Sequence, residues 1–173
     1  MKKQVNTVIN AAGRAVPTDV NGKPVIPFKG VGKHRPEGNK YGPPISTCID
    51  FPADGSKLNA TLKQALIASG LKDGMTISTH HHFRNGDVIA NQIFDIAAEL
   101  GIKNLVWFPS ASFDCHTPLI KYLEDGTIHH IEGSMNGQLG RVTSAGKMQG
   151  VGVLRSHGGR YQAVQDGEVK IDI

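Results

Sequence analysis

The alternation of apolar and polar positions is clearest between residues 75 and 101. Residues 75–80 alternate β-branched and small side chains and predict a buried strand. A short polar loop follows, and an amphipathic helix is predicted to begin after Asp87 and to end at Gly101. Its apolar face is expected to contain Val88, Ile89, Ile93, Ile96 and Ala97. We expect the rest of the chain to be organised around this strand, loop and helix.

Further helices and strands are predicted along residues 56–173. A helix is expected over 56–70, with Ser56 as its N-cap and Gly70 just beyond its last turn. The other predicted elements are strands at 104–108, 127–131 and 151–155 and helices at 117–124 and 141–147. The run at 104–108 is apolar almost throughout, which is typical of a strand whose two faces are both covered.

This order of elements predicts an α/β fold, a mostly parallel sheet with helices on both faces, because parallel neighbours are connected by right-handed crossovers. Residues 1–55 are rich in Gly, Pro, Asn and Lys and predict an irregular N-terminal arm without a core of its own. Short apolar segments at 5–9, 25–28 and 45–49 are expected to anchor it. Residues 169–173 alternate like a strand that has just begun, so we expect 56–173 to be the truncated first domain of a longer protein.

Charge distribution, hydropathy and cysteine content limit the kinds of partner and compartment that we expect. The net charge is +4, but Lys and Arg are scattered and form no basic stripe, so we expect no nucleic-acid binding. No apolar run is long enough to span a bilayer and no signal peptide is recognisable, so we expect no membrane attachment. The two cysteines, Cys48 and Cys115, are expected to be reduced in the cytoplasm. A small or acyl-linked anion is the better match as a partner.

Polar, basic and glycine residues follow the ends of three predicted strands. In open α/β sheets ligands bind at this edge, where a cation and backbone N–H groups suit an anion. Glycine there lets a ligand approach the backbone. The candidate ligand-binding residues are His81, His82, Phe83, Arg84, Asn85, Gly86, Ser110, Ser112, His157, Gly158, Gly159 and Arg160.

The histidines also raise the question of a metal site. Consecutive strand residues face opposite sides, so at most His80 and His82 share an ion. Further ligands would have to come from Asp114, Cys115, His116 and His157. We expect no metal, and a purely structural function of these histidines stays open.

The sequence offers no obvious catalytic group. Cys115 beside His116 is not expected to act as a thiol nucleophile, because adjacent residues do not easily place a ring nitrogen on the neighbouring sulfur. No pair of carboxylates lies at a strand end, so no acid/base couple is identified and the catalytic residue is unknown.

Short motifs occur along most of the chain. They are, in order, Asn10-Ala-Ala-Gly-Arg14, Lys40-Tyr-Gly-Pro-Pro44, Gly70-Leu-Lys-Asp-Gly-Met75, His81-His-Phe-Arg-Asn-Gly-Asp87, Ser112-Phe-Asp-Cys-His-Thr-Pro118 and Ser156-His-Gly-Gly-Arg160. Together they resemble the alpha subunit of citrate lyase, the citrate CoA-transferase component. Each motif is short, but their order and spacing together are specific to this family.

The resemblance implies a CoA-transferase-like fold of the NagB/RpiA type, built in the family from two related halves, of which this chain resembles the arm and the first half. It also implies an exchange of acetate for citrate on the thioester of an acyl carrier protein. The implied partners are citrate, the acetyl and citryl acyl carrier protein and the beta and gamma subunits of citrate lyase, in an oligomer. No tightly bound cofactor is implied, because the CoA-derived prosthetic group belongs to the carrier protein. Related two-step CoA-transferases use a catalytic glutamate, which matches no position of this chain, and the chain alone is expected to be inactive.

Two other functions stay open at this stage. The same anion-binding loops would serve an isomerase or deacylase on a related fold, acting on a sugar phosphate or a simple acyl-CoA. The lack of a carboxylate pair would suit a non-catalytic binding domain whose arm holds a partner.

Overall fold

A computed structural model describes residues 5–27, 56 and 58–173. The chain divides into two compact units, Met1–Lys40 and Tyr41–Ile173. Cys48, the apolar segment 45–49 and the motif at 40–44 lie outside the described residues. The predicted domain boundary between 55 and 56 adjoins undescribed residues, and it stays a prediction.

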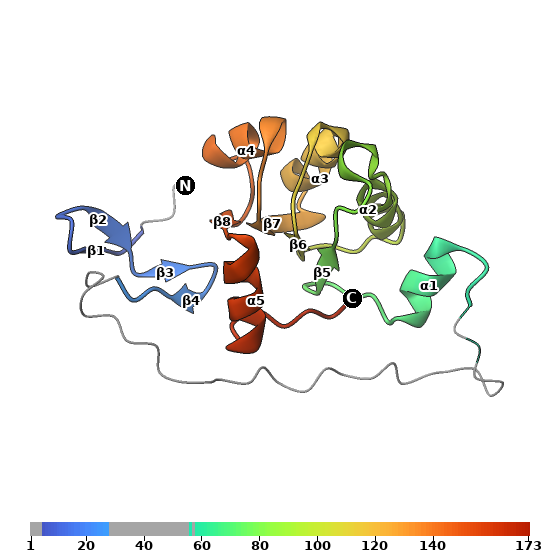
Figure 1. Cartoon of the computed structure of the whole chain (residues 1–173), viewed down its shortest axis with the longest axis horizontal. Coiled ribbons are helices and arrows are strands. Elements are labelled where there is room, and N and C mark those ends of the chain that lie inside the picture. The colour runs from blue at the N-terminus through green and yellow to red at the C-terminus, as the bar shows by residue number, and fades with distance from the viewer. Residues whose placement is uncertain (1–4, 28–55, 57) are drawn as a thin grey trace. The chain divides into compact units, whose positions relative to one another are not determined.

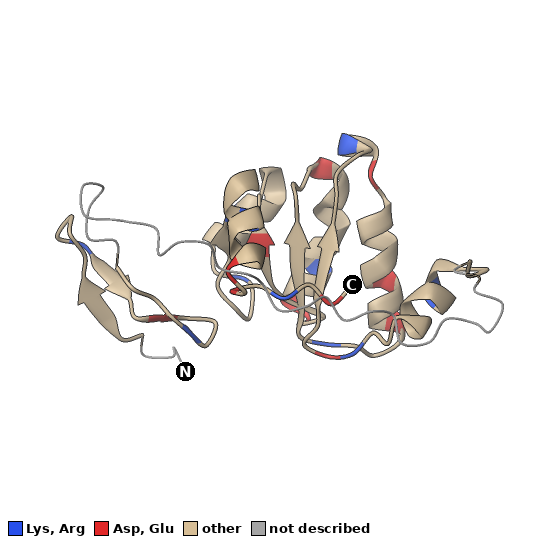
Figure 2. Cartoon of the chain, turned by 60° about the horizontal axis from the view of Figure 1, so that its bottom comes forward, with Lys and Arg blue, Asp and Glu red and all other residues tan. Residues whose placement is uncertain are grey.

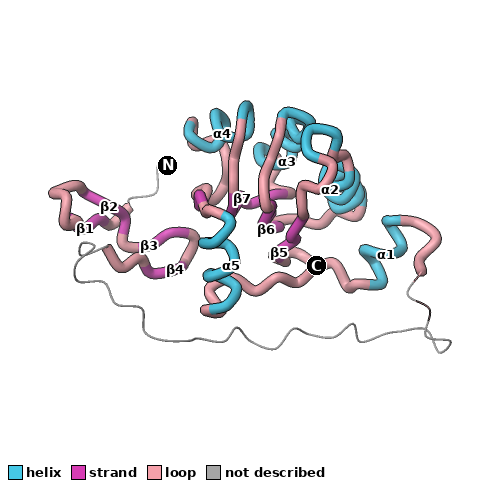
Figure 3. Tube along the Cα trace, in the orientation of Figure 1, coloured by secondary structure: helices cyan, strands magenta, loops and turns pink. Residues whose placement is uncertain are grey.

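The N-terminal unit contains two short β-hairpins. Strand β1 (Thr7–Ile9) pairs antiparallel with β2 (Ala15–Pro17), and β3 (Asp19–Val20) pairs antiparallel with β4 (Lys23–Pro24) (Figure 3). The predicted N-terminal arm therefore contains two short hairpins in its described residues, and its extent over 1–55 stays a prediction. Asn21 and Gly22 join β3 to β4 with φ of +54° and +76°, and an Asn-Gly pair of this kind is the usual sequence signal of a tight hairpin.

Four parallel strands form the sheet of the larger unit, in the order β5-β6-β7-β8. They are β5 (Thr76–Thr79), β6 (Leu105–Pro109), β7 (Ile128–Gly133) and β8 (Val153–Leu154). Each coincides with a predicted strand, which confirms the parallel α/β prediction. Residues 169–173 form no strand, although the N–H of Ser78 donates to the carbonyl oxygen of Ile173 over 2.8 Å.

Helices cover both faces of this sheet (Figure 1). They are α1 (Leu62–Ala68), α2 (Ile89–Glu99), α3 (Ile120–Glu124), α4 (Gly137–Ser144) and α5 (His157–Gln165), with 3-10 turns η2 (Arg84–Gly86) and η3 (Asp114–Leu119). Side chains of α1 to α4 pack on one face with Ile77 and Trp107. Ala163 of α5 packs on the opposite face with Phe108.

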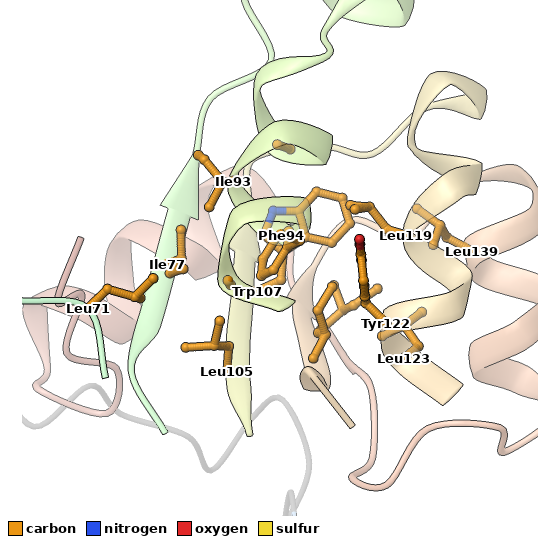
Figure 4. Packing of buried hydrophobic residues seen from close by; sticks show 14 of the residues in the cluster. Leu71, Ile77, Ile93, Phe94, Leu105, Trp107, Leu119, Tyr122, Leu123 and Leu139 are labelled. Atoms are coloured by element: carbon orange, nitrogen blue, oxygen red, sulfur yellow. The ribbon is translucent and has the colours of Figure 1, made fainter. Parts of the chain in front are cut away.

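Trp107 lies at the centre of the main core. It is fully buried, its ring meets that of Phe94 edge-on at 5.9 Å between centroids, and its Nε1 donates to Oγ1 of Thr79 over 3.0 Å. Figure 4 shows Phe94, Trp107 and Leu119 packed together. Trp107 and Phe108 face opposite sides because strand residues alternate, which explains why the apolar run 104–108 serves two cores.

Two predicted helices differ in detail from the observed ones. Helix α1 begins at Leu62 rather than Ser56, because Thr61 is the N-cap and accepts from the backbone N–H of Gln64 over 3.1 Å. Gly70 follows this helix with φ of +74°, as predicted. The buried face of α2 consists of Ala90, Ile93, Phe94 and Ala97, whereas the predicted Val88 and Ile89 are exposed.

The C-terminal part of the chain contains more helix than expected. Helix α4 occupies Gly137–Ser144, so it begins four residues before the predicted helix at 141–147 and ends three residues before that helix does. Helix α5 was not predicted at all, because Gly158 and Gly159 lower its intrinsic helix propensity. Packing of Ala163 and Val164 with Phe108 and Val169 stabilises it instead.

Charged residues of both signs are interspersed along the described chain, with no continuous basic stripe (Figure 2). Among the described residues, no helix has both the length and the apolar character that crossing a bilayer requires.

Candidate functional site

Three predicted segments meet at one edge of the sheet, where the parallel strands end. The loop 80–88 follows β5, Ser110 follows β6, and His157 begins α5 after β8. The rings of His81 and His157 lie edge-on with 5.8 Å between centroids, so residues from the first and last of these segments are neighbours. This is the edge at which open α/β sheets bind ligands.

His81 and Ser110 form the closest contact of the site. The backbone N–H of His81 donates to Oγ of Ser110 over 3.1 Å, and Nδ1 of His81 lies 2.5 Å from the same oxygen. Ser110 is only 1% exposed. The pair therefore ties the loop after β5 to the end of β6 at a point shielded from water.

The surroundings of His81 favour the neutral form of its imidazole. Burial lowers its pKa below the ordinary value of 6.5, and the positive charges that His80, His157, Arg84 and His82 carry when protonated lower the pKa of His81 further. A neutral imidazole has one N–H donor and one acceptor nitrogen, so it contacts an anion through a hydrogen bond rather than through net charge.

Arg84 places a cation on the exposed side of the same loop. It lies in η2 with φ of +50°, a left-handed conformation that non-glycine residues seldom adopt. In the described part of the chain no carboxylate forms an ion pair with it. An exposed guanidinium held in a strained turn suits ligand contact better than a role in stability.

The neighbours of Arg84 differ in what they contribute. Oδ1 of Asn85 accepts from the backbone N–H of Cys115 over 3.0 Å and so fastens η2 to η3. No atom lies within 4 Å of the position that a Cβ of Gly86 would occupy, which leaves room beside the backbone. His82 and Phe83 are exposed, with Phe83 at 65%.

The hydroxyl of Ser112 is used in hydrogen bonds within the protein interior. It is fully buried, its Oγ donates to the carbonyl oxygen of Ser134 over 3.1 Å, and it accepts from the backbone N–H of Asn136 over 2.9 Å. These bonds use the hydroxyl to join the segments that follow β6 and β7. Its assignment to the binding site stays a prediction, and its burial favours a structural function.

His157, Gly158 and Gly159 form the first turn of α5 rather than a loop, which corrects the predicted strand-end loop at 156–160. Ser156 is the N-cap and accepts from the backbone N–H of Gly159 over 3.0 Å. The first turn of a helix presents unpaired N–H groups and the positive end of the helix dipole. His157 therefore contacts the ring of His81 and also belongs to the first helical turn, whose N–H groups favour a negatively charged ligand.

Arg160 reaches away from this turn and onto the sheet. Its Nη2 donates to the carbonyl oxygen of Phe108 over 2.8 Å and to Oγ of Ser78 over 3.1 Å, and its guanidinium carbon lies 4.4 Å from the centroid of the Phe108 ring. Burial lowers the pKa of Arg160. Nε is buried and has no partner among the described residues, so the guanidinium is held against the sheet with unused donor capacity.

Sγ of Cys115 lies 3.8 Å from Nδ1 of His116, closer than expected for adjacent residues, but two features argue against a nucleophile and its base. Burial raises the pKa of the Cys115 thiol, and Sγ lies 3.3 Å from the carbonyl oxygen of Asp87. Nδ1 of His116 already accepts from the backbone N–H of Phe113 over 2.9 Å. A thiol with a raised pKa is a poor nucleophile at neutral pH. Among the described residues, no three His, Cys, Asp or Glu side chains are grouped to hold a metal ion.

Two carboxylates that were not predicted as site residues, Asp87 and Glu132, are buried near the strand ends. Asp87 is 3% exposed, accepts from the backbone N–H of Ile89 over 3.0 Å at the start of α2, and lies 3.6 Å from Nε2 of His116. Glu132, near the end of β7, contacts His130 and Arg155 at 3.2 Å each. Asp87 precedes Val88, the N-cap of α2, so an acidic residue at the start of this helix was recognisable from the sequence, whereas the surroundings of Glu132 depend on tertiary structure.

The lowered pKa values of His116 and His129 predict that the stability of the fold is sensitive to acid. Burial lowers the pKa of His116, and burial also lowers that of His129. The unfolded chain then binds more protons than the folded one below about pH 6.5, so stability is complete above that pH and falls as the pH drops toward the lower folded pKa. Each such proton contributes up to about 1.4 kcal/mol per pH unit.

We therefore expect a lower urea midpoint at pH 5.5 than at pH 7.5, and a smaller difference in the variant His116→Gln. Equal midpoints of the wild type at the two pH values would show that these imidazoles are not buried in the neutral form.

A cavity is also present among residues other than the predicted site residues. A cavity of about 560 Å³ is lined by α4 and the segment 146–154, with Met135, Met148, Val151 and Leu154 among its apolar walls. None of the predicted site residues lines it. Because this cavity contains none of the predicted ligand-binding residues, the candidate site stays at the strand ends.

Comparison with known proteins gives consistent results. The family model "Citrate lyase, alpha subunit (CitF)" matches residues 55–173. The citrate lyase alpha chain of Escherichia coli (strain K12) is 42% identical over 118 residues, which are 68% of this chain and 23% of that protein. The citrate lyase alpha chain of Haemophilus influenzae is 39% identical over 131 residues, which are 75% of this chain and 26% of that protein.

A solved structure is similar in both fold and sequence. It is the putative alpha subunit of citrate lyase from Streptococcus mutans, in complex with citrate, with a TM-score of 0.70 and 33% identity over 80% of this chain and 27% of that one. The matched part of the chain thus spans about a quarter of the length of these relatives.

Proposed function

The chain belongs to the citrate lyase alpha subunit family, and from that premise we propose that it serves the citrate CoA-transferase reaction, in which citrate replaces acetate on the thioester of an acyl carrier protein. The C–S bond of the acetyl thioester breaks and a C–S bond to a carboxyl carbon of citrate forms. Acetate leaves with the oxygen that the citrate carboxylate gives up, so citryl thioester and acetate are the products.

The family match over residues 55–173 carries this proposal. The chemistry of the strand-end edge supports it, because citrate carboxylates and a thioester carbonyl both need donors of positive character. Arg84 offers a cation there, His81 a neutral imidazole, and the first turn of α5 backbone N–H groups. The related Streptococcus mutans protein is described as a complex with citrate, which agrees with a tricarboxylate as substrate.

The proposed partners follow from the same premise. They are citrate, the acetyl and citryl acyl carrier protein with its CoA-derived prosthetic group, and the beta and gamma subunits of citrate lyase, assembled in the cytoplasm. The chain would need no tightly bound cofactor of its own, because the carrier protein brings the thioester.

The 173-residue chain by itself is expected to be catalytically inactive. In the described residues, the two carboxylates buried near the strand ends, Asp87 and Glu132, are already held by His116 and by His130 and Arg155. Both carboxylates are thus engaged by neighbouring side chains, and the matched part of this chain spans only about a quarter of the length of the relatives. Acetate release by the purified chain, supplied with citrate and acetyl carrier protein, would refute this expectation.

Mass spectrometry of the carrier protein tests the proposed reaction. The native full-length polypeptide is incubated with acetyl carrier protein and citrate, and we expect the acetyl adduct to be replaced by a citryl adduct as acetate accumulates. A parallel incubation with sugar phosphates and simple acyl-CoA esters tests the rival enzyme class. Turnover of those compounds without carrier-protein exchange would reject the proposal, and binding without any turnover would favour a non-catalytic domain.

A further inference from the structure

The contact between His81 and Ser110 determines which ring nitrogen of His81 carries the proton. Oγ of Ser110 accepts from the backbone N–H of His81 at 3.1 Å and lies 2.5 Å from Nδ1 of the same residue. A serine hydroxyl has one hydrogen to donate and two lone pairs. The direction of the 2.5 Å bond therefore depends on where else that hydrogen could go.

Burial limits the choice. Ser110 is 1% exposed, so water is not a general alternative acceptor. Among the described residues, Nδ1 of His81 is the acceptor within hydrogen-bond distance of this hydroxyl. If Nδ1 carried a proton, it would donate to Oγ and leave the hydroxyl hydrogen without a partner, and buried polar groups are rarely left so. The hydroxyl therefore donates to Nδ1, and the proton of the neutral ring lies on Nε2.

We propose that Ser110 is a positioning residue that fixes His81 in the Nε2–H tautomer, so that His81 presents one neutral N–H donor to a carboxylate or thioester oxygen at the strand-end edge. The tautomer follows from the contacts of Ser110 alone, while the identity of the oxygen rests on the proposed function. Ser110 itself is not a nucleophile in this scheme, because its burial denies it contact with a substrate.

The surroundings of His81 agree with a donor. Nε2 lies across the ring from Nδ1 and so points away from Ser110, and in the described part of the chain it makes no hydrogen bond. The titratable and charged groups around the ring are His80, His82, Arg84 and His157, and Phe113 contacts it with 5.6 Å between centroids. All four of those groups lower the pKa of His81 and so disfavour a positive charge on its ring. The ring is therefore a neutral N–H donor beside the Arg84 cation.

Ring-nitrogen NMR of the full-length protein tests the tautomer without any ligand. Histidine labelled with ¹⁵N in the ring is incorporated, and His81→Asn identifies the signals that belong to residue 81. At pH 7.5 we expect Nδ1 to resonate as an unprotonated nitrogen and Nε2 as a protonated one. A protonated Nδ1, whether in the other tautomer or in an imidazolium, would overturn the proposal, and this result does not depend on folding of any variant at Ser110.

Two variants distinguish a specific effect of Ser110 on the His81 tautomer from a general structural effect of a buried hydroxyl. Ser110→Ala should give a mixture of tautomers and weaken citrate or thioester binding by about two- to tenfold, the value of one neutral hydrogen bond. Ser112→Ala removes another buried hydroxyl that contacts no histidine ring, and it should leave the His81 signals unchanged. A Ser110→Ala protein that keeps the wild-type tautomer would contradict the assignment.

Ligand addition tests the donor role. Citrate or acetyl carrier protein at saturation should shift the Nε2 signal of His81, and an unchanged signal with both would contradict the role. If the tautomer is as stated but acyl exchange is absent, the proposed function fails while the control of His81 by Ser110 stands. If acyl exchange occurs but Nδ1 of His81 is protonated, the proposed function stands and the control of His81 by Ser110 fails.

Discussion

Arg84→Ala in the full-length protein is expected to weaken binding of citrate or of the acyl thioester by about tenfold to a hundredfold, with little change in melting temperature. A charge-assisted pair between guanidinium and carboxylate contributes roughly 1.5 to 3 kcal/mol, which corresponds to that range. The side chain is exposed and its loop is held by other residues, chiefly Asn85 and Asp87. Alanine is also as unfavourable as arginine at φ of +50°, so the strain of the turn is retained.

Arg141→Ala provides the matched control, because it removes an exposed arginine from α4, away from the strand-end loops. Affinities are measured by calorimetry and melting temperatures by circular dichroism. A folded Arg84→Ala protein that binds both ligands as tightly as the wild type would remove Arg84 from the site. A large fall in melting temperature would make it a structural residue.

Trp107→Ala is expected to lower the free energy of unfolding by about 3 to 5 kcal/mol, the usual range for truncating a large core aromatic. The ring is 0% exposed, packs against Phe94 and His116, and donates to Thr79. Its loss leaves a cavity at the centre of the core and a hydroxyl without its donor. Stability is followed by circular dichroism in urea, since this is the single tryptophan of the chain.

Trp107→Phe keeps most of the aromatic volume and should be clearly less destabilising than Trp107→Ala. Equal destabilisation by the two substitutions would mean that the hydrogen bond to Thr79 matters more than packing. A change of less than about 1 kcal/mol for Trp107→Ala would contradict the described core.

Much of the sheet was predictable because local pattern and burial agree there. The apolar run ending at Phe108 and the alternation around Ile77 both mark buried strands, and both are found. Helix α5 was missed because its two glycines oppose helix formation locally, and its contact with Phe108 is set by tertiary packing. The face of α2 was misjudged because Val88 and Ile89 are apolar yet stay exposed at its start.

The site was predictable only as a set of strand ends. That His81, Ser110 and His157 belong together followed from parallel topology, which places the ends of parallel strands at one edge. The contact of His81 with Ser110 required the register in which Thr79 is paired with Pro109, and this register is not encoded in either segment alone. The hydrogen bonds that Ser112 and Arg160 make within the protein likewise depend on neighbours distant in sequence.

A crystal structure of the full-length protein with citrate tests the central claim most directly, namely that the strand-end edge formed by these residues binds the substrate. We expect a citrate carboxylate within hydrogen-bond distance of the Arg84 guanidinium or of Nε2 of His81. Citrate bound with no contact to the loop 80–87, Ser110 or the first turn of α5 would contradict the account.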